Sequence, residues 1–250
     1  MVFGLDTFAR HFAGYEENYV LIGGTACELV LAEVGQSFRA TKDLDLVLVA
    51  ETIDAAYVTR FLDFVSLGGY EHVGRSKAGE QYYRFDQPAD PTFPAMLELF
   101  SRRPELLVGM DTHLGRVQVE DAPHSLSAIL LDDDYYGLLG RGTVRVQGLP
   151  VLDLEHLPVF KMKAWLELAA TRERGEHVNT ADITKHKNDV FRLTSAIDPD
   201  RRIDLPASVR QDVDAFLASV PLTRNDLANL GLRGYTPGEL RALISGVYAA

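Results

Sequence analysis

Short apolar runs punctuated by turn residues fill the first 150 positions, and helical spacing of apolar residues dominates after them. The run at 19–22 ends in a glycine pair, a helix-length segment follows, and 44–49 has the Val- and Leu-rich character of an interior strand. The pattern predicts further strands near 70–74, 82–86, 95–101, 115–120 and 143–154, helices at 5–15 and 53–67, and a hairpin turn near Lys77 to Glu80. This order predicts a mixed sheet without regular βαβ alternation.

From Leu157 onward the apolar positions follow a period of about 3.6 residues. Helices are predicted at 157–170, 180–195, 206–219 and 236–248, separated by glycine and proline breaks. We therefore expect an α+β (mixed α/β) fold in two parts, an α/β domain at 1–152 and a helical domain at 153–250. The triple aspartate at 132–134 is expected to be a solvated turn or a helix start, because consecutive side chains point in different directions.

Composition narrows the classes of function. With 46% hydrophobic and 24% charged residues the chain is typical of a soluble globular protein, and no apolar run is long enough to span a membrane. The N-terminus lacks a basic region followed by an apolar one, and Cys27 has no second cysteine to pair with, so we predict a cytoplasmic protein. A net charge of −11 argues against indiscriminate binding of nucleic acid, so a polyanionic ligand would need a local basic patch or a metal ion.

Three carboxylates lie in predicted strands that are otherwise apolar. Asp43 and Asp45 are two residues apart, so their side chains emerge on the same face, and burying both is costly without a compensating cation or hydrogen bonds. Glu98 lies between two leucines in another strand, where it is either a third member of the group or an edge residue facing water. Hard oxygen ligands without thiolate or paired imidazole favour Mg²⁺ or Mn²⁺. We therefore predict a metal-binding, catalytic cluster of Asp43, Asp45 and Glu98.

The turn between the first strand and the helix after it suits a phosphate. Gly23 and Gly24 let the backbone approach a bulky ligand, and the N–H groups at a helix N-terminus attract phosphate oxygens. Thr25 adds a hydroxyl and is predicted to cap the helix.

Positive charge gathers in the helical part, at Lys161, Lys163, Arg172, Arg174, Lys185, Lys187 and Arg192. These side chains either receive a triphosphate or an RNA backbone, or pair at helical spacing with Glu167, Glu173, Asp182 and Asp189. We favour the binding interpretation for Lys161 and Lys185, and expect Asp189 to orient Lys185. Trp165 is expected in the core.

Gly23-Gly24-Thr25, Asp43-Leu44-Asp45 and Glu98 together resemble the nucleotidyltransferase superfamily that shares its fold with DNA polymerase beta. Within it the chain looks most like the AbiEii-type enzymes of bacterial toxin-antitoxin and phage-defence systems. Residues 39–45 (RATKDLD) match their basic approach to the acidic strand. Lys161 and residues 185–189 (KHKND) resemble their lysine-bearing helix and K-D-x-x-D-like motif.

This resemblance implies a polymerase beta-like fold and transfer of a nucleotidyl group from a nucleoside triphosphate to a hydroxyl of RNA, tRNA in particular, or of a protein. Asp43 and Asp45 would bind two Mg²⁺ ions, and Glu98 would complete the site and help to deprotonate the acceptor. Gly23, Gly24, Thr25, Lys42, Lys161 and Lys185 would bind the nucleotide. The implied partner is a cognate toxin or antitoxin. The alternative is a non-catalytic nucleotide-sensing or toxin-binding module, against which the intact acids argue.

Overall fold

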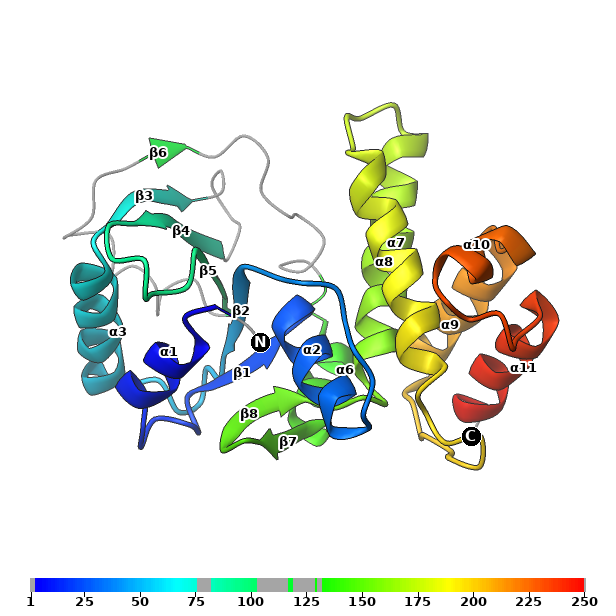
Figure 1. Ribbon diagram of the computed structural model, residues 1–250, viewed down its shortest axis with the longest axis horizontal. Helices are drawn as coiled ribbons and strands as arrows, with labels where there is room; N and C mark the ends of the chain where they lie inside the picture. Colours follow the sequence, from blue (N-terminus) through cyan, green and yellow to red (C-terminus); the bar gives the residue numbers. More distant parts are fainter. Residues whose placement is uncertain (1–2, 76–81, 103–116, 119–128, 130–131, 250) are drawn as a thin grey trace. The chain divides into compact units, whose positions relative to one another are not determined.

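The computed structural model describes residues 3–75, 82–102, 117–118, 129 and 132–249 (Figure 1). Contacts divide the chain into two compact units. The first comprises Met1–Leu131 and Thr143–Leu152, and the second comprises Asp132–Gly142 and Asp153–Ala250. Strands and helices build the first unit, and the described residues of the second unit form helices, so the fold is a mixed α+β fold as predicted.

One eight-stranded sheet runs through the first unit in the order β6-β3-β4-β5-β2-β1-β8-β7. Its strands are β1 (Tyr19–Ile22), β2 (Asp43–Leu48), β3 (Tyr70–Arg75), β4 (Tyr82–Pro88), β5 (Met96–Phe100), β6 (Val117–Gln118), β7 (Thr143–Val146) and β8 (Leu149–Leu152). The pairs β2–β5, β1–β8 and β3–β6 are parallel and the other pairs antiparallel, which confirms a mixed sheet. β2 is an interior strand, as its apolar character predicted.

In the described residues of this unit the helices are α1 (Leu5–His11), α2 (Gly23–Glu33) and α3 (Ala55–Gly68). Aromatic rings join α1, α3 and the sheet, with Phe8 on Phe64 at 5.6 Å between centroids and Phe61 on Phe85 of β4 at 5.6 Å. Phe85 is in register with Leu97 and Leu97 with Leu44, and all three are fully buried. This face of the sheet is therefore a hydrophobic core covered by α3, and residues one position along each strand point to the opposite face.

The second unit contains α6 (Asp133–Arg141), α7 (Leu157–Glu173), α8 (Thr180–Thr194), α9 (Ala207–Ser219), α10 (Arg224–Asn229) and α11 (Pro237–Val247). α7 and α8 lie side by side (Figure 1). Trp165 of α7 is buried edge-on against Phe216 of α9 at 5.3 Å, which confirms its core position. None of the helices in the described part of the chain is long and apolar enough to cross a membrane.

The triple aspartate begins a helix, one of the two predicted alternatives. The Asp132 carboxylate accepts hydrogen bonds from the Asp134 and Tyr135 backbone N–H groups and so caps α6. The predicted helix at 5–15 ends at His11, and α10 was not predicted. The predicted turn at Lys77 to Glu80 and most of the strand at 115–120 lie outside the described residues.

Candidate functional site

Parallel pairing of β2 with β5 brings the predicted acids onto one face of the sheet. Asp45 is in register with Glu98, and Asp43 lies two residues earlier, opposite Met96. Both aspartates are half-buried and Glu98 is 9% exposed. Because β5 lies between β4 and β2, the interpretation of Glu98 as an edge residue facing water is wrong.

Glu98 has a basic partner that the sequence did not predict. Arg84 of β4 lies directly opposite Glu98, and its Nε and Nη2 atoms donate to Glu98 Oε1 at 3.0 and 2.7 Å. Asp86 lies two residues further along β4, in register with Met96 and so on the same face. The sequence signal that could have found this partner is the alternation of aromatic and charged residues at 83–86. In the structure, Tyr83 and Phe85 are buried, and Arg84 and Asp86 are half-buried on the other face.

The glycine pair brings the start of α2 against Asp45. The Gly24 N–H donates to Asp45 Oδ2 across 3.4 Å, a long contact at the positive end of the helix dipole. Gly23 has φ +65°, and a Cβ at this position would lie 1.7 Å from Asp45 Oδ2. A Cβ on Gly24 would lie 2.8 Å from Thr41 Oγ1. The left-handed φ and the nearby Asp45 carboxylate therefore favour glycine at position 23, whereas a side chain at position 24 would require Thr41 to shift.

Thr25 has a different role from the predicted one. The left-handed φ of Gly23 already turns the chain out of β1, so α2 begins there, Ile22 precedes it, and the prediction of Thr25 as the cap is wrong. Its hydroxyl is fully buried and donates to the Asp43 backbone carbonyl at 2.8 Å. This hydrogen bond from Thr25 holds α2 against β2 at Asp43, the first residue of the strand.

The predicted lysines occupy different environments. Lys42 is exposed directly before β2 in the first unit. In the second unit, Lys161 Nζ of α7 lies 3.6 Å from Asp189 Oδ2 of α8, with only 8% and 3% of the two side chains exposed. Asp189 therefore pairs with Lys161 rather than with Lys185, which is half-exposed on α8.

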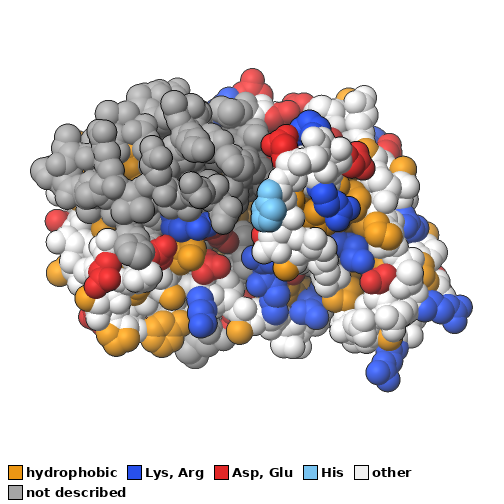
Figure 2. Space-filling view, turned by 90° about the horizontal axis from the view of Figure 1, so that it is seen from above, with side chains coloured by type: hydrophobic (Ala, Val, Ile, Leu, Met, Phe, Trp, Pro, Cys, Tyr) orange, Lys and Arg blue, Asp and Glu red, His pale blue; other side chains and the backbone are white. Residues whose placement is uncertain are grey.

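Several other cations of the helical unit are ion-paired, which favours the pairing interpretation for them. Lys163 Nζ lies 3.0 Å from Asp212 of α9, and Lys187 Nζ lies 3.1 Å from Asp226 of α10. These acids lie on other helices, not one turn away on the same helix as predicted. Over the helical unit, Figure 2 shows Lys and Arg side chains with Asp and Glu among them.

Asp43, Asp45 and Glu98 have the right chemistry for Mg²⁺, but their carboxylates do not converge on one point in this structure. Among the described residues, no group of three His, Cys, Asp or Glu side chains is arranged to hold a metal ion, so the three-carboxylate cluster is not formed. Glu98 Oε1 faces Arg84 and Asp45 Oδ2 faces the Gly24 N–H. Asp43 and Asp45 still offer hard oxygens from one strand face, which suits the ion.

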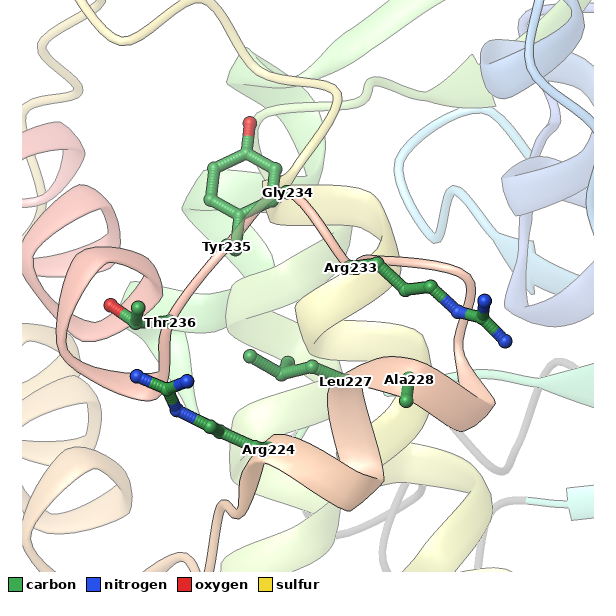
Figure 3. A pocket seen from close by; sticks show the side chains of 7 residues that line it. All are labelled: Arg224, Leu227, Ala228, Arg233, Gly234, Tyr235 and Thr236. Atoms are coloured by element: carbon green, nitrogen blue, oxygen red, sulfur yellow. The ribbon is translucent and has the colours of Figure 1, made fainter.

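A cavity of about 200 Å³ lies in the second unit, between α10 and the start of α11. Leu227, Tyr235 and two arginines help to line it (Figure 3). The guanidinium groups of Arg224 and Arg233 point in opposite directions in Figure 3, so they do not form a clamp for one phosphate.

The chain has no match among protein-family models, curated proteins or solved structures. We therefore infer function from the acidic face of the sheet, defined as Asp43, Asp45, Arg84, Asp86 and Glu98, and from the glycine turn beside it.

Proposed function

We propose that this protein is a Mg²⁺- or Mn²⁺-dependent nucleotidyltransferase with a polymerase beta-like fold, related to the AbiEii-type enzymes. It would transfer a nucleotidyl group from a nucleoside triphosphate to a hydroxyl of RNA, with tRNA the leading acceptor, or of a protein. The observation that carries the proposal is the register of Asp45 with Glu98, with Asp43 on the same face and the glycine start of α2 against Asp45.

Metal ions bound at Asp43 and Asp45 would neutralise the triphosphate and align it for displacement. In the reaction, the acceptor oxygen forms a bond to the α-phosphorus while the bond from that phosphorus to the bridging oxygen breaks, which releases pyrophosphate. The Glu98 carboxylate would take the acceptor's proton. Thr25 would keep α2 on β2, so that the backbone at Gly23 and Gly24 approaches the phosphates.

The test supplies a triphosphate labelled at the α-phosphorus, together with Mg²⁺ and either total RNA or cell lysate. We expect wild type to transfer label and Asp43→Asn and Asp45→Asn to lose at least about a hundredfold in rate, because both lose a charged ligand of the metal. Asp63→Asn, which removes an exposed carboxylate of α3, is the matched control and should retain the wild-type rate. Label in RNA would favour a toxin and label in protein an antitoxin. Absence of transfer by wild type would exclude this activity for these acceptors.

One observation favours a second candidate, a nucleotide-sensing or toxin-binding module without turnover. Arg84 holds the carboxylate that would accept the proton. This candidate predicts that wild type binds a fluorescent triphosphate but transfers no label. Equal binding by wild type, Asp43→Asn and Asp45→Asn would place the nucleotide elsewhere and contradict both the transferase and a nucleotide sensor at this face.

The assignments of Lys42, Lys161 and Lys185 to nucleotide binding stay predictions, as do the cytoplasmic location and the toxin or antitoxin partner. Lys42→Gln and Lys185→Gln remove exposed or half-exposed charges, so their nucleotide affinities can be compared directly with wild type. Lys161→Gln also breaks a buried ion pair, so its stability must be measured beside its affinity.

A further inference from the structure

The ion pair on the acidic face joins neighbouring interior strands. Two nitrogens of the Arg84 guanidinium share Glu98 Oε1, and the side chains are 20% and 11% exposed. A partly buried carboxylate with such a partner is well compensated in charge. Removing Arg84 would therefore lower the stability of the fold, because Glu98 would be left desolvated without this cation.

Arg84 is also placed in line with the predicted metal ligands. Pairing of β4, β5 and β2 sets Arg84, Glu98 and Asp45 in one row across the sheet. Asp43 and Asp86 form the ends of the adjacent row, with Met96 between them. The guanidinium thus supplies positive charge to a face that carries four carboxylates.

We infer that Arg84 is a built-in counter-ion that competes with a divalent metal for Glu98, and so sets the metal affinity of the acidic face. The inference rests on the proposed function. Arg84 is a positioning residue in this scheme: it compensates Glu98 when no metal is bound and gives up Oε1 when one is. A metal charge and a guanidinium charge on the same small face repel each other, so each weakens the hold of the other.

This role predicts opposite effects of one substitution. Arg84→Gln should lower the melting temperature of the metal-free protein, because Glu98 loses its partner. The same change should tighten metal binding, because the competing charge is gone. An arginine with only a structural role would lower stability and leave the metal affinity unchanged or weaker.

The experiment titrates the full chain with Mn²⁺ alone and follows free Mn²⁺ by electron paramagnetic resonance. We expect the Kd of Arg84→Gln to be about tenfold lower than that of wild type, and that of Arg84→Lys, which keeps the charge, to be close to wild type. Arg145→Gln is the matched control: it removes the same charge from the same unit and breaks an exposed ion pair with Glu17. Its Kd should stay at the wild-type value.

A measurement on wild type alone keeps the inference testable if Arg84→Gln does not fold. Phenylglyoxal modifies accessible arginines, and mass spectrometry locates the modified residues. Adding Mn²⁺ should raise the modification of Arg84 severalfold and leave that of Arg145 unchanged.

The outcomes separate this inference from the proposed function. If wild type binds Mn²⁺ and Arg84→Gln binds it no more tightly, or if Mn²⁺ does not raise the reactivity of Arg84, the inference is wrong and the proposed function stands. If wild type and the folded Arg84→Gln variant both fail to bind Mn²⁺, the metal-dependent function fails as well.

Discussion

Gly23 and Gly35, at the two ends of α2, have nearly the same left-handed backbone, with φ +65° and +72°, but different surroundings. A Cβ on Gly35 would meet nothing within 4 Å, whereas one on Gly23 would overlap Asp45 Oδ2 at 1.7 Å. Substituting each of these two glycines therefore separates the cost of the backbone conformation from the cost of crowding the Asp45 carboxylate.

We predict that Gly35→Ala lowers the free energy of unfolding by about 1 kcal/mol, the penalty for a left-handed residue with a side chain. Gly23→Ala should cost at least about 1 kcal/mol more, because Asp45 or the start of α2 must shift. Urea unfolding of both variants measures the difference. Equal losses would show that the Asp45 carboxylate moves aside without cost.

At the residue scale, the sequence predicted which side chains share a face better than what they contact. The two-residue spacing of Asp43 and Asp45 and the apolar surroundings of Glu98 were enough to place all three. Arg84 was missed because its contact with Glu98 depends on the register of β4 against β5, which no local pattern specifies. Thr25 was misassigned because the helix begins two residues earlier, at a glycine.

At the scale of elements, the loop of the β7–β8 hairpin contains a strained residue, Gln147, and a substitution there can relieve the strain. Val146 pairs with Leu149, which leaves a two-residue loop, and both loop residues have positive φ, 52° at Gln147 and 83° at Gly148. Loops of this kind favour Asn or Gly at the first position.

We predict that Gln147→Gly or Gln147→Asn raises the free energy of unfolding by about 0.5 kcal/mol, because Gln adopts this φ less readily. Gly148→Ala should lower it by about 1 kcal/mol, although a Cβ there would meet nothing within 4 Å. Thermal or urea unfolding checks both signs. A stabilising Gly148→Ala would contradict the assigned backbone of the turn.

Glu167 of α7, where this helix packs against α6 and α9, has a carboxyl group that titrates near neutrality. Burial raises the pKa of the Glu167 carboxyl to about 7; Lys163 opposes this rise and the negative charge of Asp212 adds to it. Asp212 also accepts a hydrogen bond from the Tyr135 hydroxyl at 3.0 Å and pairs with Lys163. Glu167 is therefore more readily protonated in the folded chain than in the unfolded one.

The sign of the pH effect follows from this raised pKa. Folding takes up a proton at Glu167 between the unfolded pKa of 4.5 and the folded value of about 7. Its contribution to stability is therefore complete below pH 4.5 and is lost as the pH rises through about 7.

We predict that Glu167→Gln, which mimics the protonated form, gains stability relative to wild type as the pH rises from 5 to 8, by up to about 3 kcal/mol. Glu173→Gln, on the exposed end of the same helix, is the matched control. Urea unfolding at several pH values measures the difference between variants. A difference that does not change with pH would contradict a raised pKa.

Element types were largely predictable because they depend on local periodicity. β1 has the predicted limits, and α7, α8, α9 and α11 lie within a few residues of theirs. The six-residue α10 was missed because it is too short for a helical period to emerge. The strand order could not be predicted, since parallel pairing of β2 with β5 joins segments that are about fifty residues apart.

At the scale of the whole molecule, the chain passes between the two units three times. The change to helical spacing of apolar residues near Leu157 predicted a domain boundary at 152. The segment 132–142 lies before that boundary but belongs to the second unit. The reason is the packing of α6. Tyr135 is 1% exposed, lies edge-on against Phe160 of α7 at 5.4 Å, and donates to Asp212 of α9.

This topology predicts that a chain divided after Leu152 stays associated. Fragments 1–152 and 153–250 should co-purify when expressed together, because the first carries the helix that completes the core of the second unit. Tyr135→Ala should abolish co-purification, since losing a buried aromatic costs about 3–5 kcal/mol. Tyr135→Phe keeps the ring and loses the bond to Asp212, at a cost of about 1 kcal/mol, so it should only weaken association. The undivided Tyr135→Ala chain controls for general misfolding. If the fragments carrying Tyr135→Ala still co-purify as well as wild type, contacts outside α6 hold them together, and the segment 132–142 is not what joins the two pieces.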